Sequence, residues 1–267
     1  MDSDSKSVEA YLKEPEIHRQ WERAYRTAEN EAFYERAFDY LAQKINAPEN
    51  AAFLDAGCGS GSHSIRLAKR GFQVQAVDFS QNVLSLAREN VKDMGLESKI
   101  KIQRQDICAL SFDSESFPFI VSWGVLMHVP NFEKALGELV RVLKPGGILV
   151  LSENNMDSLE AKLIRMFKKG KTRIKKSPSG LEFWRSHDSG ELVVRLTHIP
   201  WLIEKLSGQG LTLKERIAGQ FSEAYARFSS PCLQNLFHNL NKFWFKYFKK
   251  NPRPAFGNIL IFQKTKR

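Results

Sequence analysis

Cysteine is scarce in this chain, and long hydrophobic runs are absent from it. The 267 residues include three cysteines, Cys58, Cys108 and Cys232, which are too few and too scattered for a disulfide framework or a zinc site. No apolar stretch reaches the roughly 18 residues of a membrane span. The first five residues are polar and acidic, unlike a signal peptide. We therefore expect a cytoplasmic protein without a metal site.

Acidic residues are also scarce in the second part of the chain. Residues 1–155 hold 18 basic and 22 acidic residues, whereas residues 156–267 hold 22 basic and 8 acidic ones. Six positive charges lie in the run 168–176. Such a run is often only a solvated surface. The functional alternative is attraction to a phosphate-bearing substrate, a nucleic acid or an anionic membrane.

A glycine loop is present, but it lacks the third glycine of a dinucleotide-binding fingerprint. A buried strand at 53–56 leads into Gly57, Gly59 and Gly61, and a helix begins at Ser62. Glycine lets the backbone turn sharply and approach a ligand closely. A pyrophosphate would need glycine where Ser62 stands, and Asp55 would repel it. A cationic sulfonium ligand with an amino acid tail suits this loop better.

The next strand, at 72–77, ends at an acid. Asp78 follows the first glycine of the loop by about twenty residues, which places it at the carboxyl end of the neighbouring strand. A carboxylate there lies within reach of a ribose diol. The loop and this acid together predict a bound nucleoside.

Four motifs occur in the order typical of one enzyme family. The strand, D-x-G-C-G-x-G loop and downstream acid resemble motif I of class I S-adenosylmethionine (SAM) methyltransferases. Residues 101–107 resemble the strand whose acid, here Asp106, bonds the adenine amino group in that family. Residues 119–130 resemble the fourth strand and the loop behind it, and residues 134–147 the helix and turn before the fifth strand. The resemblance covers roughly residues 50–155.

The hydrophobic pattern agrees with the fold that this resemblance implies. Apolar residues recur at helical spacing over 83–87 and 136–143, and the apolar run 148–151 suits a buried parallel strand. We expect an α/β, doubly wound, seven-stranded Rossmann-like sheet with helices on both faces. The predicted domains are an N-terminal helical cap at 1–48 and a methyltransferase domain at 49–267. Insertions are expected at about 169–192 and 220–255.

The resemblance also implies a cofactor and its binding residues. The cofactor would be S-adenosyl-L-methionine, with S-adenosyl-L-homocysteine as its product. Ligands bind such sheets at the carboxyl ends of the strands. The residues expected to bind the cofactor are Asp55, Gly57, Cys58, Gly59, Gly61, Asp78, Phe79, Asp106, Ile107 and Trp123. We interpret Cys58 as a small space-filling residue and not as a nucleophile.

Three appendages surround the predicted core. Residues 6–47 are interpreted as two helices that either close over the cofactor or pack on the core. Residues 169–192 are interpreted as a Gly/Ser/Lys-rich loop. The insert 220–255 separates strands that form a tight hairpin in the family, and its aromatic and aliphatic residues recur at i, i+3, i+4 and i+7. That helix could pack on its own core, cover an apolar acceptor, or lie on a membrane interface.

His128 is the candidate catalytic residue, because it follows the fourth strand, where this fold presents residues to the methyl group. A structural role for His128 is the alternative, and His187 and His198 are weaker candidates. An oxygen or carbon acceptor needs a base to take its proton. No D/N-P-P-Y/W signature of amide N-methylation follows the fourth strand, and the Pro-Cys pair at 231–232 lies far from it.

The predicted function is methyl transfer from SAM to a small molecule, with O-methylation ahead of N- or C-methylation. A sugar, a glycolipid or a prenylated aromatic compound would match the basic half and the aromatic insert. The alternatives are an RNA or protein methyltransferase and a non-catalytic SAM-binding subunit. We expect no nucleic-acid partner, since no RNA-binding module is recognisable, but a peripheral membrane contact is one option. No pattern predicts the oligomeric state.

Overall fold

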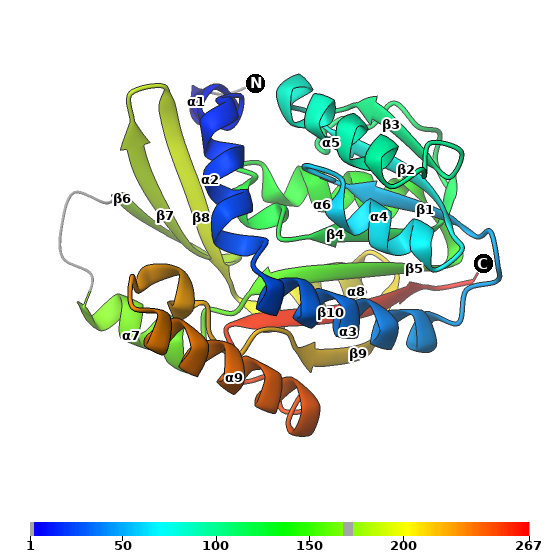
Figure 1. Cartoon of the computed structure of the whole chain (residues 1–267). Helices are drawn as coiled ribbons and strands as arrows, with labels where there is room; N and C mark the ends of the chain where they lie inside the picture. Colours follow the sequence, from blue (N-terminus) through cyan, green and yellow to red (C-terminus); the bar gives the residue numbers. More distant parts are fainter. Residues whose placement is uncertain (1–2, 168–172, 267) are drawn as a thin grey trace.

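A computed structural model describes residues 3–167 and 173–266 and contains a seven-stranded sheet in the order β3-β2-β1-β4-β5-β10-β9 (Figure 1). The first five strands in this order run parallel, and β10 is antiparallel to both of its neighbours. This arrangement confirms the predicted fold class. The strands are β1 Ala52–Ala56, β2 Gln73–Asp78, β3 Ile100–Arg104, β4 Phe117–Trp123, β5 Leu143–Asn154, β9 Leu211–Ala218 and β10 Gly257–Lys264.

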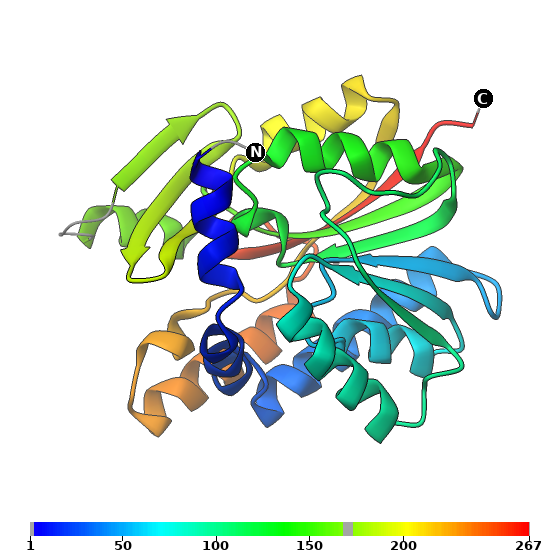
Figure 2. The same cartoon turned by 90° about the horizontal axis from the view of Figure 1, so that it is seen from above.

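Helices cover both faces of the sheet, as Figure 2 shows. Successive strand residues point to opposite faces, so Phe53 of β1 enters one core and Leu54 enters the other. The helices on the Phe53 side are α3 (Ala28–Ile45), α4 (Ser62–Lys69), α5 (Gln81–Asp93) and α9 (Pro231–Tyr247). The helices on the Leu54 side are α6 (Phe132–Val142) and α8 (Ile199–Gly208). Apolar side chains on both faces therefore bury the central strands, whereas the edge strands β3 and β9 stay partly exposed.

The N-terminal segment forms three helices, not the two that we predicted. α1 (Ser3–Leu12) and α2 (Pro15–Tyr25) precede α3. The break comes at Glu14, because a residue before proline is disfavoured in helical conformation while proline itself suits the first helical turn. Thr27 then caps α3 by accepting a hydrogen bond from the backbone N–H of Asn30. α3 packs on the sheet, whereas α1 and α2 lie beyond the strand ends (Figure 1).

The predicted loop at 169–192 is wrong, since the described part of this region is an antiparallel sheet. Its strands are β6 (Arg173–Ser177), β7 (Gly180–His187) and β8 (Gly190–Thr197). The turns at 178–179 and 188–189 each have two residues, and a glycine follows each of them. At Gly190, with φ of 153°, an added Cβ would collide with the backbone of α1. The first five residues of the basic run at 168–176, which are residues 168–172, lie outside the described residues.

The insert before the last strand has two parts. The short helix η2 (Ala224–Arg227) comes first, and α9 follows it. Phe245 of α9 is buried against Phe33 of α3, with ring centroids 5.2 Å apart.

Another short helix, η1 (Leu126–His128), follows β4, and α7 (Leu159–Phe167) follows β5. Among the described residues, no helix is both long enough and apolar enough to cross a membrane.

Candidate functional site

A cavity of about 1110 Å³ lies at the carboxyl ends of the central strands. One part of its wall is the glycine loop and the ends of β2, β3 and β4, and the other part comes from α1, α2, η1, β8 and η2. The cavity thus lies where doubly wound sheets bind ligands. Its volume is slightly above the roughly 300–1,000 Å³ typical of small-molecule sites.

Backbone hydrogen bonds hold the glycine loop in place at one wall of this cavity. The N–H groups of Gly57 and Cys58 both donate to the carbonyl of Val77 at 2.8 Å. Gly57 has a φ of 85°, and a Cβ there would collide with Val125. Near Gly59 no atom lies within 4 Å of the position that a Cβ would take, so its backbone borders open space. The loop is therefore rigidly supported, and its backbone faces open space at Gly59.

Asp55 and Gly61 support this loop from behind and are not among the residues that line the cavity. Asp55 is buried at the end of β1, where it accepts a 2.6 Å hydrogen bond from the Ser64 hydroxyl. Burial raises the pKa of Asp55 to about 6. Gly61, with φ of 82°, precedes α4. Cys58 lines the cavity but is mostly buried, and burial raises the pKa of its thiol well above the usual value.

The other predicted cofactor-binding residues all line the cavity: Asp78, Phe79, Asp106, Ile107 and Trp123. One carboxylate oxygen of Asp78 accepts the Gly59 N–H at 3.0 Å, and the other accepts the Ser80 N–H at 3.0 Å. Asp106 accepts the Cys108 N–H at 2.8 Å. Local bonds therefore fix both carboxylates at the cavity edge. Their roles in binding ribose and adenine stay predictions.

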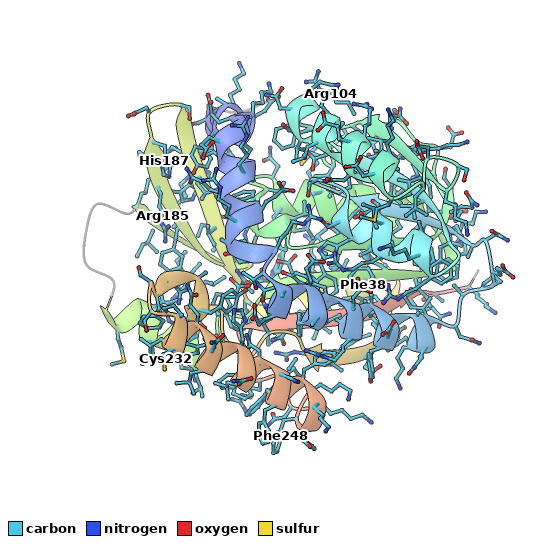
Figure 3. All side chains as sticks on the ribbon, in the orientation of Figure 1. Phe38, Arg104, Arg185, His187, Cys232 and Phe248 are labelled. Atoms are coloured by element: carbon cyan, nitrogen blue, oxygen red, sulfur yellow. The ribbon has the colours of Figure 1, made fainter. Side chains whose placement is uncertain are left out.

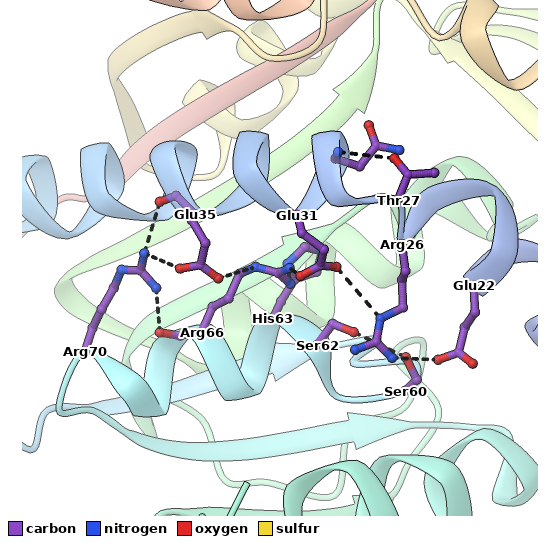
Figure 4. A network of polar contacts seen from close by, with 11 residues as sticks. Glu22, Arg26, Thr27, Glu31, Glu35, Ser60, Ser62, His63, Arg66 and Arg70 are labelled. Atoms are coloured by element: carbon purple, nitrogen blue, oxygen red, sulfur yellow. Dashed lines mark hydrogen bonds and ion pairs between the residues drawn. The ribbon is translucent and has the colours of Figure 1, made fainter. Parts of the chain in front are cut away.

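Charged residues join the N-terminal helices to the helix that follows the glycine loop (Figure 4). Arg66 of α4 is almost fully buried and pairs with Glu31 and Glu35 of α3. Arg70 also bonds to Glu35, at 2.8 Å. Arg26, after α2, pairs with Glu31. These ion pairs fix the position of the N-terminal helices relative to the loop.

His128 lies in η1 between α2 and β8. Its Nδ1 lies 2.8 Å from the carbonyl oxygen of Val193, which can only accept, so Nδ1 carries the proton. The ring of His128 stacks on Trp21 with centroids 5.1 Å apart. Burial lowers the pKa of His128 to about 4, so the ring is neutral near pH 7 and Nε2 keeps its lone pair. His128 lines the cavity, as expected for the candidate base.

Arg195 of β8 holds the η1 segment. Its guanidinium donates to the carbonyls of Leu126 and Val129 at 2.9 and 3.1 Å and pairs with Glu182 of β7 at 2.6 Å. The side chain of Arg195 is 1% exposed. The small antiparallel sheet therefore fixes the loop that carries His128.

The other two candidate histidines are not among the residues that line the cavity. His187, with Arg185, lies on β7 of the small sheet (Figure 3), and its ring stacks on Tyr11 at 4.4 Å. His198 is the N-cap residue of α8. Its backbone carbonyl accepts the Leu202 N–H, and its side chain makes no capping hydrogen bond. Neither position favours a role in proton transfer inside the cavity.

Sequence reasoning missed a cluster of polar residues on the far wall of the cavity. Glu223 lies just before η2, and its pKa is raised to about 7 by burial, with Glu160 adding to the effect. Tyr25 also lines the cavity, and the charge of Glu223 is the largest cause of its raised pKa. Arg227 pairs with Glu160. No local motif marks these residues, because different segments meet only in the folded chain.

The insert at 220–255 contributes its first residues to the cavity. Gln220, Glu223, Ala226 and Arg227 line it, whereas no residue of α9 does. Trp244 of α9 packs instead on Phe221, with centroids 4.4 Å apart. The start of the insert therefore borders the cavity and the aromatic helix does not, while a role of the insert over an acceptor stays a prediction.

Comparisons with known proteins agree with this arrangement. A family model described as a methyltransferase domain matches residues 54–151. Demethylmenaquinone methyltransferase of Bacillus subtilis (strain 168) is 33% identical over 124 residues, which are 45% of this chain and 53% of that protein. The chain spans about half the length of the curated relatives it matches.

Solved structures resemble the chain over more of its length. An S-adenosylmethionine-dependent methyltransferase from Clostridium acetobutylicum ATCC 824 has a TM-score of 0.63 at 15% identity, covering 94% of this chain and 98% of that one. The cyclase SpnF has a TM-score of 0.59 at 19% identity, covering 87% and 82%. At such identities the likeness establishes the fold alone, since one fold hosts many reactions.

Proposed function

We propose that the protein methylates a hydroxyl group of a small molecule. The premise is that residues 54–151 form a class I SAM-dependent methyltransferase domain. The single observation that supports this proposal most is the composition of the cavity. The predicted cofactor residues Asp78 and Asp106 line one part of it, and His128 and Glu223 line another. Bound SAM would supply an electrophilic methyl group to the acceptor.

The chain's own residues fit such a cofactor. The glycine loop presents backbone, the Asp78 carboxylate is held at the loop edge, and no phosphate-binding fingerprint is present. Asp78 would accept hydrogen bonds from the ribose, and Asp106 would accept one from the adenine. Their local bonds keep both carboxylates in position without the ligand, which lowers the ordering entropy lost on binding.

The acceptor part of the cavity combines apolar and basic side chains. The apolar ones include Leu12, Trp21, Met127, Leu192 and Val194. Among the basic ones, Arg26 pairs with Glu22 and Glu31, and Arg227 pairs with Glu160, so Arg185 is the best candidate to bind an anionic part of the acceptor. We therefore favour a sugar, a glycolipid or a prenylated aromatic compound. The relative named for demethylmenaquinone supports an apolar acceptor.

A hydroxyl acceptor must lose its proton as the new carbon–oxygen bond forms and the carbon–sulfur bond breaks. The cavity is lined by Glu223 and His128, and also by Glu9, Glu22, Glu31 and His63. A general base works best when its pKa lies near the working pH. The pKa of Glu223 is raised to about 7, whereas that of His128 is lowered to about 4. We therefore propose Glu223 as the base and His128 as a neutral group that orients the acceptor.

The pH dependence of kcat/KM should identify the base. Because Glu223 must be ionised to accept a proton, kcat/KM should rise as the pH increases through about 7 and then level off. Glu223→Gln should remove this rise and lower kcat by about 10²-fold or more. A rate that is flat above about pH 6 in the wild type would instead favour His128.

Glu153→Gln is the matched control for that experiment. Burial also raises the pKa of Glu153 to about 7, but Glu153 bonds to the Thr197 hydroxyl and does not line the cavity. The rise of kcat/KM with pH should persist in this variant. If kcat/KM rises with pH in neither variant, the pH dependence of the wild type comes from the stability of the protein and not from proton transfer.

Tritium transfer from labelled SAM into fractionated cell extract tests the class of acceptor. Label is expected in small molecules that an organic solvent extracts. Label in RNA or protein would contradict the proposal and favour a macromolecular acceptor. Binding of S-adenosylhomocysteine without any transfer would favour a non-catalytic subunit.

A further inference from the structure

Helix α9 has two apolar faces, although only one of them packs on the protein. Asn241 and Phe245 are buried on the inner face, where Phe245 contacts Phe33 and lies near Tyr40. Leu233, Leu236, Leu240, Phe243 and Tyr247 occupy a row on the opposite side, at i, i+3, i+7, i+10 and i+14. Packing on the core explains only the inner row.

The outer row is largely exposed to solvent. Leu236 is 59% exposed, Phe243 51% and Tyr247 60%, and Leu233 is also exposed. Phe248, directly after the helix, is 44% exposed and lies at the edge of the molecule (Figure 3). Single exposed apolar residues are ordinary on protein surfaces, but a contiguous row of large apolar side chains is not. Such a row indicates a binding partner.

The charges beside this row indicate the kind of partner. Lys242 and Lys246 are exposed and lie on one side of the row, and Lys250 is exposed just beyond the helix. The 17 residues of α9 include no acidic residue. If α9 paired with the same helix of a second copy, no carboxylate of either helix would offset these lysines. An anionic surface would offset the charges of these lysines.

We propose that α9 lies on an anionic lipid bilayer, with the Leu233–Tyr247 row inserted among the acyl chains and the lysines at the headgroups. Leu, Phe and Tyr on one side of a helix and lysine beside them are the composition of interfacial helices. Lysine near an anionic leaflet adds to the attraction. The docking does not depend on which acceptor the protein methylates.

This orientation would also bring the cavity wall close to the bilayer. η2 lies three residues before α9, and its residues Ala226 and Arg227 line the cavity. An acceptor dissolved in the membrane would therefore have a short path to the site. This second step rests on the proposed function, whereas the docking itself is tested without any methyl transfer.

Co-sedimentation with vesicles tests the docking. The wild type should sediment with vesicles of phosphatidylglycerol and phosphatidylcholine in equal parts, and not with phosphatidylcholine alone, and high salt should release it. The variant Leu236→Ser/Phe243→Ser/Tyr247→Ser should bind at least roughly tenfold more weakly. Lys242→Gln/Lys246→Gln should also bind at least roughly tenfold more weakly.

Met94→Ser is the matched control, because Met94 is 53% exposed on a different part of the surface, after α5. This variant should bind vesicles like the wild type. Thermal unfolding and binding of S-adenosylhomocysteine should be unchanged in all variants, since the substituted side chains are exposed. Failure of the wild type to sediment would overturn the proposal. A wild-type dimer that the triple serine variant converts to a monomer, without vesicle binding, would overturn it too.

Discussion

Replacing Asp78 by alanine is expected to weaken the binding of S-adenosylhomocysteine at least about tenfold. In the proposed complex the Asp78 carboxylate accepts two ribose hydroxyls, and hydrogen bonds to a charged group contribute about 1.5–3 kcal/mol each. About 1.4 kcal/mol corresponds to a tenfold change in affinity. The same carboxylate accepts the Gly59 N–H, so its loss also loosens the glycine loop. Isothermal titration calorimetry measures the dissociation constant.

Asp106→Ala serves as the comparison for this variant. Asp106 would accept a single bond from the adenine, so the loss of affinity should be smaller than for Asp78→Ala. NAD should bind far more weakly than S-adenosylhomocysteine to the wild type, because Ser62 stands in place of the third glycine. An unchanged dissociation constant in Asp78→Ala would exclude the ribose role, and tighter binding of NAD would contradict the cofactor.

Arg195→Met is expected to lower the free energy of unfolding by about 3–5 kcal/mol, the range for removing one partner of a buried ion pair. The substitution leaves the carbonyls of Leu126 and Val129 without their donor and Glu182 without its cation. A loss of this size lowers Tm by roughly 10 °C. Denaturant titration followed by circular dichroism measures it.

Two further variants show whether the buried charge causes this loss. Adding Glu182→Gln to Arg195→Met should restore part of the stability, since no uncompensated carboxylate then remains. Arg173→Met removes exposed ion pairs with Glu191 and Asp4 and a contact with the Trp184 ring. Exposed pairs contribute little, so the loss of stability should be well below that of Arg195→Met. Equal losses in Arg195→Met and Arg173→Met would contradict the importance of the Arg195 contacts to η1.

The central fold could be predicted from the sequence because its signals are local. The glycine loop carries the residue type that its backbone conformation requires, and Asp78 ends β2 as predicted, whereas the predicted turn at 145–147 lies within β5. Gly57, for example, has a positive φ and no room for a Cβ beside Val125. Helical spacing of apolar residues then predicted the layers. Such signals do not depend on how distant segments meet.

The small antiparallel sheet was missed although its signals were also local. Glycine and serine at 178–180 and 188–190 were interpreted as loop composition, but they form two-residue turns between short strands. β8 contains the aliphatic run Leu192-Val193-Val194, followed by Leu196. Such a short run with β-branched residues, bounded by Gly190, is the strand signal that the interpretation overlooked.

The properties of the cavity wall with Glu223 and His128 could not be predicted from the sequence, because tertiary packing alone creates them. Glu223 is an acid in an irregular segment, and its high pKa depends on burial and on Glu160 from α7. His128 lies where the family resemblance suggested, but its neutral state depends on Trp21 and β8 around it. Proton affinity at such positions is a property of the assembled environment.

The separate apolar cluster between α1 and the small sheet has a kinetic consequence. Val8 and Leu12 of α1 pack with Trp184 and Val193, apart from the two main cores, and Phe79, directly after β2, packs against the same cluster. The two elements are fitted closely at Gly190, so we expect them to move as one body. Because Phe79 also lines the cavity, the rate at which this body moves would affect the exchange of a ligand at that wall.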